Sequence, residues 1–370
     1  DYHLFYAKHT GEELEKRCGH SWWHLVTRDF VHFDDWGEAL PAGEPGSREA
    51  YLNTGSVIER QGTFHWFYPG HNHEHLETDT PQQAILHATS DDLRTWTRDP
   101  KFEFYAPSHY EKHSWGDPFV VLNEESNEYW MLLAARKTSG PKFHRGITAL
   151  AESTDLKTWH VSEAFWESDM YLDIECADLF RMGDWWYLVH SGSIGSPGTC
   201  YRMSRSPRGP FHAPADETFD DWMFYAAKTA GDGTKRYAFG WVMSRVGEKD
   251  DGTPDYAGSL VVHEIVQQPD GTLALDDIEA VIKPDDPHFA RTRLVVIENT
   301  VGGKPLDKGR KYTLATNDYM AGGGDGYKVF KQGKVLINAS GGTLMANTVI
   351  DHIAASGGIR AKLEGRIVKQ

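Results

Sequence analysis

The sequence is poor in cysteine and in long apolar runs. Its three cysteines, Cys18, Cys176 and Cys200, are too few and too widely spaced for a disulfide framework or a CxxC metal site. No stretch approaches the ~20 apolar residues of a membrane span, and no basic segment followed by an apolar core opens the chain. These absences leave the cellular compartment unknown.

Positive charge is also scarce. Acidic residues outnumber basic ones 54 to 38, and the formal net charge is −16. A field of this sign repels nucleic acids and anionic membranes at long range, but it does not affect neutral polyols and sugars. We therefore expect no nucleic-acid or membrane partner, and a neutral oligo- or polysaccharide remains a candidate ligand.

Sustained helical periodicity is absent as well. Aromatic residues make up 12% of the chain, which also has 36 Gly and 17 Pro, a composition that favours short strands joined by many turns. Aromatic strand candidates recur five times, at residues 2–6, 63–68, 128–133, 185–189 and 236–241. The recurrence indicates a repeated structural unit.

A second motif follows the first three of these strands and combines a small residue, an acid, Leu or Phe, and an aromatic. Its acids, Asp29, Asp92 and Asp155, are each separated by 63 positions. A period of roughly 40 to 65 residues with strands and turns is typical of β-propellers, whose blades are four-stranded sheets. The sequence predicts an all-β domain over residues 1–283, a five-bladed β-propeller, with a β-sandwich as the alternative.

In a propeller, the short segments that precede the aromatic strands converge on one mouth. These segments are residues 53–56, 114–119, 173–176 and 220–225. Asp117 and Glu175 occupy similar places in neighbouring repeats, and Asp173 projects from the same strand face as Glu175 because side chains alternate along a strand. We therefore predict a site that contains several carboxylates.

Paired carboxylates with flat apolar walls are what cleavage of a glycosidic bond requires. One acid protonates the leaving oxygen, while a second attacks or activates water. Trp22, Trp66 and Trp115 could supply the walls, and the predicted substrate-binding set is Ser56, Trp66, Trp115, Gly116, Cys176 and Asp220. We expect no cofactor. We also expect no metal, since the histidine-rich stretch 71–75 follows Pro-Gly and has the composition of a solvated loop.

The motif Glu175-Cys-Ala-Asp-Leu-Phe180 resembles the Glu-Cys-Pro-Asp motif of glycoside hydrolase family 32, the invertases, levanases and inulinases. Further stretches resemble that family in the same order: Tyr2-His-Leu-Phe-Tyr6, Thr54-Gly-Ser56, Asp117-Pro118 and Phe224-Tyr-Ala226. The resemblance covers residues 1–283. It implies retaining hydrolysis of β-fructosidic bonds, with Glu175 as acid/base and Asp117 as the transition-state stabiliser that binds ring hydroxyls.

Three departures from the family pattern affect this expectation. The family's nucleophilic Asp lies about ten residues before the strand that corresponds to Tyr2–Tyr6, so the resemblance implies a truncated N-terminus and an incomplete catalytic set. Gly116 replaces the Arg of Arg-Asp-Pro, and Ala177 replaces the Pro of Glu-Cys-Pro. Two alternatives remain open: an inverting propeller glycosidase of the arabinanase or xylosidase type, and a non-catalytic sugar-binding propeller.

The character of the chain changes after residues 284–287. Strand patterns at 293–297 and 312–316 and a helical pattern at 348–353 predict a small α+β segment over residues 290–370. Gly323-Gly-Asp-Gly-Tyr327 and neighbouring motifs resemble the closing portion of the C-terminal domain of 5′-nucleotidases. Because the metal-binding domain of those enzymes is absent from the sequence, we expect no nucleotidase activity, and we expect Tyr327 to be a core aromatic.

Overall fold

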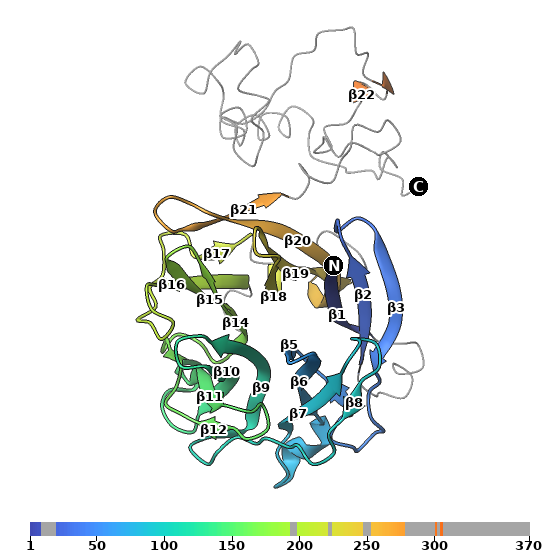
Figure 1. Cartoon of the computed structure of the whole chain (residues 1–370), viewed down its shortest axis with the longest axis vertical. Coiled ribbons are helices and arrows are strands. Elements are labelled where there is room, and N and C mark those ends of the chain that lie inside the picture. Colours follow the sequence, from blue (N-terminus) through green and yellow to red (C-terminus); the bar gives the residue numbers. More distant parts are fainter. Residues whose placement is uncertain are drawn as a thin grey trace, which may run out of the picture. The chain divides into compact units, whose positions relative to one another are not determined.

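A computed structural model describes residues 1–8, 20–192, 198–220, 224–246, 253–277, 300–301 and 304–305. The chain divides into two compact units, Asp1–Phe289 and Ala290–Gln370. In the first unit, five antiparallel sheets are arranged around a common centre (Figure 1). The predicted five-bladed β-propeller is therefore confirmed.

The blades follow one another along the chain, and their strands have the following bounds. Blade I contains β1 (Tyr2–Lys8), β2 (Ser21–Thr27) and β3 (Phe33–Leu40); blade II contains β4 (Tyr51–Leu52), β5 (Ser56–Arg60), β6 (Thr63–His71), β7 (Gln83–Ser90) and β8 (Thr97–Arg98). Blade III contains β9 (Tyr110–Asn123), β10 (Glu128–Lys137), β11 (Gly146–Ser153), β12 (His160–Val161) and β13 (Trp166–Glu167). Blade IV contains β14 (Ile174–Met182), β15 (Trp185–Gly192), β16 (Gly198–Ser204) and β17 (Thr218–Phe219); blade V contains β18 (Phe224–Gly231), β19 (Arg236–Arg245), β20 (Pro254–Gln267) and β21 (Leu273–Asp277).

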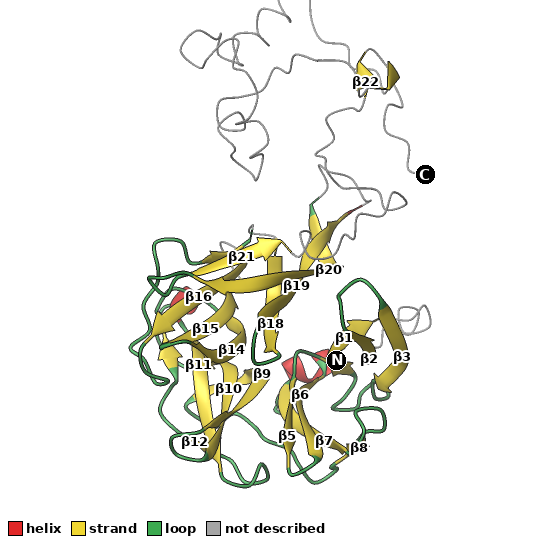
Figure 2. Ribbon diagram, turned by 45° about the horizontal axis from the view of Figure 1, so that its top comes forward, coloured by secondary structure: helices red, strands yellow, loops and turns green. Residues whose placement is uncertain are grey.

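The five aromatic segments predicted from the sequence are β1, β6, β10, β15 and β19. In blades II to V this strand pairs with the inner strand or strands on one side and with the following strand on the other. Among the described strands of blade I, β1 pairs only with β2. Apart from the short 3-10 helices η1 (His73–Glu77) and η2 (Lys142–His144), the described chain between strands consists of loops (Figure 2).

Hydrophobic side chains fill the seams between blades. Each of four buried clusters combines residues of two neighbouring blades; for example, Phe67 of blade II packs with Trp115 and Met131 of blade III. At the seam between blades V and I, the ring centroid of Tyr237 lies 5.5 Å from Tyr2 and 4.7 Å from Phe30. A blade thus buries its apolar faces by stacking on its neighbours, which explains why both faces of its strands are apolar.

The 63-residue repeat corresponds to one local turn that recurs in three blades. In each copy a hydroxyl, of Thr27, Ser90 or Ser153, accepts a backbone N–H from the residue three positions later at 2.9 Å. Those later residues, Phe30, Leu93 and Leu156, have φ values of 60°, 62° and 64°. The conserved geometry shows that the repeated small-residue and acid motif encodes a turn rather than a site.

In the second unit the structure describes only the antiparallel pair β22 (Thr300–Val301) and β23 (Lys304–Pro305). The strands predicted at 293–297 and 312–316, the helix predicted at 348–353 and Tyr327 lie outside the described residues. Within the described ranges, no helix is long and apolar enough to cross a membrane.

Candidate active site

The inner strands of blades III, IV and V share one irregularity near the propeller centre. Each contains a β-bulge in which a residue other than glycine has a left-handed backbone: Asp117 (φ 50°), Cys176 (φ 55°) and Ala226 (φ 55°). Such strained bulges re-aim side chains and are common beside active sites. Three equivalent bulges therefore mark this end of the propeller as the candidate site.

The register at these bulges fixes which residues are equivalent. Gly116 pairs with Ala134, Glu175 with Ser191 and Tyr225 with Trp241, each immediately before the bulged residue. Glu175 is therefore equivalent to Gly116 and Tyr225, whereas Asp117 is equivalent to Cys176. The expectation that Asp117 and Glu175 hold equivalent places is corrected by one residue, because the sequence does not reveal the bulge register.

Asp117 is held from the neighbouring blade by Cys176. The backbone N–H of Cys176 donates to Asp117 Oδ2 at 2.9 Å, and the Cys176 thiol lies 3.6 Å from the same oxygen. Burial raises the pKa of the Asp117 carboxyl, while the Cys176 N–H opposes this shift. Burial also raises the pKa of the Cys176 thiol, so the thiol stays protonated and can donate.

Glu175 lies beside Asp117 and is bonded by a tyrosine of the next blade. The hydroxyl of Tyr225 donates to Glu175 Oε2. Burial, followed by the charge of Asp117, raises the pKa of Glu175 to about 7. The pKa of Tyr225 is also raised by burial and by Glu175, so its hydroxyl remains a donor. Near neutral pH, Glu175 can therefore both give and take a proton.

A third carboxylate, Asp173, is paired with an arginine of blade III. Arg136 Nε and Nη2 donate to the two oxygens of Asp173, both at 2.5 Å. The positive charge of Arg136 lowers the pKa of Glu175, whereas the charge of Asp173 raises it. This bidentate pair therefore partly offsets the accumulation of negative charge around Glu175.

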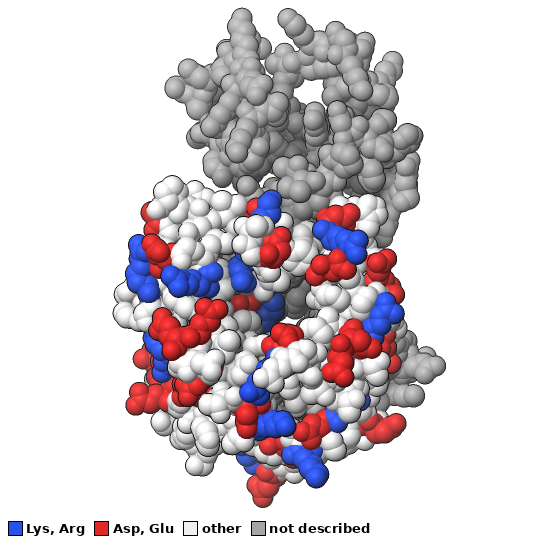
Figure 3. Space-filling model, in the orientation of Figure 1, with Lys and Arg blue, Asp and Glu red and all other residues white. Residues whose placement is uncertain are grey.

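Lysine 228 of blade V supplies a second cation near the carboxylates. Lys228 Nζ donates to the backbone oxygen of Ala177 at 2.6 Å and lies 5.0 Å from the ring centroid of Phe119. Its charge lowers the pKa of Asp117, although burial outweighs this effect. Figure 3 shows one face of the propeller hollowed near its centre, with both acidic and basic side chains beside the hollow.

The structure brings several of the predicted site residues to this place. Asp117, Glu175 and Cys176 are joined by the contacts described above. Thr54 Oγ1 of blade II lies 3.7 Å from Cys176 Sγ, and Ser56 Oγ accepts the backbone N–H of Val120 at 3.0 Å. Segments from blades II, III and IV therefore converge as the sequence predicts.

Four residues predicted to contact the substrate are buried. Trp66 and Trp115 are 1% and 0% exposed and pack in the seams between blades, so neither offers a ring face to a sugar. Trp22, the third predicted wall, is also buried in a seam. Cys176 is also buried, and its backbone N–H and thiol face Asp117.

Two further predicted residues lie at distinct places. Gly116 lies in the bulged strand, where an added Cβ would meet only Gln83, at 3.5 Å. Asp220 follows β17, and its Oδ2 lies 2.9 Å from His263 Nε2 in blade V. Asp220 thus links the end of blade IV to blade V.

Sequence reasoning missed Tyr225 and Arg136 as site residues. The signal for Tyr225 was present, since it lies in the segment predicted to reach the mouth at the position that Glu175 occupies one blade earlier. Arg136 gave no such signal, because its position at the end of an aromatic strand resembles an ordinary strand terminus.

A five-bladed propeller whose centre holds adjacent, partly buried carboxylates with a raised pKa has an architecture and an acid/base candidate that suit a glycoside hydrolase. Residues 1–272 match the family model described as glycosyl hydrolases family 32 N-terminal domain, and the chain belongs to this family. Residues 259–332 match the model of the 5′-nucleotidase C-terminal domain, a match that begins within β20 of blade V.

Individual relatives are distant. The levanbiose-producing levanase of Bacillus subtilis is 25% identical over an alignment of 267 positions, which covers 65% of this chain and 48% of the levanase. A sucrose-6-phosphate hydrolase of Vibrio alginolyticus is 27% identical over 165 residues, 44% of this chain and 31% of that protein. The chain thus spans about half the length of the levanase. A Bombyx mori family 32 β-fructofuranosidase structure shares the fold, with a TM-score of 0.59 and 20% identity, over 75% of this chain and 60% of that chain.

Proposed function

We propose that this propeller hydrolyses β-fructosidic bonds in sucrose or fructans with retention of configuration. The observation that carries the proposal is the position of Glu175, whose carboxyl lies beside Asp117 and accepts a hydrogen bond from the hydroxyl of Tyr225, and burial there raises its pKa. Membership of family 32 and the levanase and fructosidase relatives support the same class of substrate.

Glu175 acts as the acid/base. In its protonated form it donates its proton to the glycosidic oxygen as the bond to the fructosyl carbon breaks and the carboxylate of the covalent nucleophile bonds to that carbon, and Glu175 is left as a carboxylate. In the second step that carboxylate takes a proton from the water that attacks the fructosyl-enzyme intermediate, which restores the protonated acid. A pKa near 7 suits both roles.

Asp117 binds ring hydroxyls of the fructosyl unit and stabilises the transition state. The backbone N–H and the thiol of Cys176 both contact Asp117 Oδ2 and so hold the carboxylate in place. Neither of these two contacts uses Oδ1. Hydrogen bonds to ring hydroxyls that strengthen in the transition state contribute to catalysis in glycosidases.

The covalent nucleophile is the missing member of this set. The family resemblance puts an aspartate about ten residues before Tyr2. In each of blades II to V, an inner strand pairs with the aromatic strand. In blade I the aromatic strand is β1, and a segment joined before Tyr2 could pair with β1 in the same way and carry that aspartate. For the tests below, a family 32 segment that carries this aspartate is joined before Tyr2, and the resulting protein is called the extended chain.

The test compares the present chain and an upstream-extended chain on sucrose, inulin, levan and arabinan, with free monosaccharide as the readout. We expect the extended chain to release fructose from at least one fructoside and the present chain to be at least 10³-fold slower, the order of effect of losing a nucleophile. Release of arabinose alone would support the inverting alternative. Tight fructan binding by the extended chain without turnover would support the sugar-binding alternative.

A further inference from the structure

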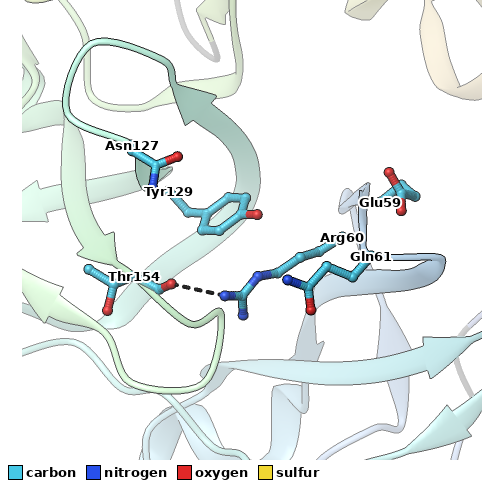
Figure 4. Close-up of a pocket in the computed structure, with 6 residues that line it drawn as sticks. All are labelled: Glu59, Arg60, Gln61, Asn127, Tyr129 and Thr154. Carbon is cyan, nitrogen blue, oxygen red and sulfur yellow. Dashed lines mark hydrogen bonds between the residues drawn. The ribbon is translucent and has the colours of Figure 1, made fainter.

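A cavity lies at the seam between blades II and III, away from the carboxylates of the candidate site. It has a volume of about 310 Å³ and is lined by Glu59, Arg60, Gln61, Asn127, Tyr129 and Thr154 (Figure 4). β5 runs from Ser56, which bonds Val120 beside the candidate site, to Arg60 at this cavity. At about 3.3 Å per residue, these ends are about 13 Å apart, so the cavity is separate from the mouth.

The guanidinium of Arg60 is held in place by contacts within the protein. Arg60 Nη1 donates to the backbone oxygen of Asp155 at 2.8 Å, and Nη2 donates to that of Thr154 at 3.3 Å. The guanidinium also lies 5.6 Å from the ring centroid of Tyr129 (Figure 4). These contacts reach from blade II to blade III, so the guanidinium and the aromatic ring keep a defined relative position.

Two amide side chains are displayed by turns with an unfavourable backbone. Gln61 and Asn127 both have φ of 55°, in the left-handed region where glycine is preferred and where a glutamine side chain is strained. Glu59 Oε1 accepts the N–H of Gly62 and so holds the turn that carries Gln61. Both turns therefore keep a polar side chain where glycine would fit the backbone better.

The lining is suited to a neutral ligand rich in hydroxyl groups. Gln61, Asn127 and Thr154 offer both donors and acceptors, Tyr129 offers an aromatic ring, and the charges of Glu59 and Arg60 balance. An anion is disfavoured by Glu59 and by the net charge of −16. The volume is at the lower end of the range of about 300–1,000 Å³ for small-ligand sites, which fits one or two sugar rings better than a larger cofactor.

We propose that this cavity is a second saccharide-binding site, which takes sugar units of a neutral polysaccharide while another part of the same polymer occupies the mouth. The inference rests on the proposed function for the identity of the polymer, a fructan. Because a fructan presents many identical units, binding at the cavity raises the local concentration of chain ends at the mouth. Sucrose is too short to reach both sites, so the cavity does not raise the affinity of the protein for sucrose.

The variant for the test is Gln61→Gly with Asn127→Gly, which removes both amides while relaxing two left-handed positions, so folding should be retained. The control is Asp184→Ala, an exposed residue of the corresponding hairpin turn in blade IV. All proteins carry Glu175→Gln, so that polymers are not cleaved. Retardation in native gels that contain levan or inulin gives the dissociation constants, and thermal melting confirms the fold.

We expect the double variant to bind levan or inulin at least fivefold more weakly, with the Asp184→Ala protein unchanged. In the active extended chain, the same variant should raise KM for the polymer with kcat unchanged and leave both constants for sucrose unaltered. Unchanged polymer binding, or an equal KM shift for sucrose, would overturn the inference while leaving the proposed fructosidase intact. If no fructoside is cleaved but neutral polysaccharides lose affinity in the double variant, the proposed function fails and the second site stands.

Discussion

The hydroxyl of Tyr225, in blade V, donates a hydrogen bond to the carboxylate of Glu175, in blade IV. This bond lowers the pKa of Glu175 against the larger effects of burial and of Asp117, which raise it. The protonation of the proposed acid/base is therefore set by three neighbouring blades together, and each contribution can be removed separately.

Replacing Tyr225 by Phe removes the bond that lowers the pKa of Glu175 and leaves the ring in place. We expect the alkaline limb of kcat/KM for sucrose, measured on the extended chain, to move to higher pH, and kcat to fall by about 10-fold because the base of the second step is no longer oriented. A pH profile that keeps its alkaline limb would show that Tyr225 does not act on Glu175.

Replacing Arg136 by Met removes a cation that lowers the pKa of Glu175 and leaves Asp173 without this partner. We expect the alkaline limb of kcat/KM for sucrose to move to higher pH. We also expect the free energy of unfolding to fall by about 1 to 3 kcal/mol, the typical penalty of leaving a partly buried charge without its pair.

The neighbouring Lys137→Met variant is the matched control for Arg136. Lys137 pairs with Glu167 and Asp169 at 2.9 and 3.0 Å on the exposed side of the same strand. Such a surface pair contributes about 0 to 1 kcal/mol, so stability and the pH profile should change little. Equal effects of the two variants would mean that the Arg136–Asp173 pair has no special role at the site.

Glu175 should also destabilise the fold at high pH. Its folded pKa of about 7 lies above its ordinary value of 4.5, so its neutral form is favoured in the native state, and stability falls as pH rises from 4.5 to 7. Glu175→Gln should therefore raise the free energy of unfolding by about 1 to 3 kcal/mol at pH 8 and change it little at pH 4. Denaturant titrations at both pH values would contradict this if the gain were the same at each.

Buried histidines should make the fold sensitive to acid. Burial lowers the pKa of His190 to about 3 and that of His87 to about 4, so both are neutral in the native state. The unfolded chain binds these protons below pH 6.5, and stability is lost as pH falls from there. His190→Phe should reduce the loss between pH 7 and pH 5 by about 2 kcal/mol. Parallel slopes of stability against pH for the two proteins would exclude this role of His190.

Much of the fold followed from the sequence, because its signals are local. Aromatic strands recur at each blade, and the 63-residue repeat encodes a hydroxyl-capped turn that any copy forms by itself. The stacking of blades was also predictable, since a strand that is apolar on both faces needs a cover on each.

The candidate site was only partly predictable, because its decisive features join separate blades. Asp117 and Glu175 could be found from the family motifs. Their positions relative to the β-bulges, which make Glu175 equivalent to Gly116 rather than to Asp117, depend on strand pairing and could not be predicted. The assignment of Trp66 and Trp115 to the substrate failed because sequence does not distinguish an aromatic side chain in a seam from one on a surface.

The central claim is that Glu175 is the acid/base of a fructosidase. The most direct measurement is the rate of fructose release from sucrose by the upstream-extended chain, compared between Glu175→Gln and the exposed-loop control Glu124→Gln. The account predicts a loss of about 10²- to 10⁴-fold in kcat for Glu175→Gln and no loss for the control. A Glu175→Gln protein that keeps its rate within a few-fold of the parent would contradict it.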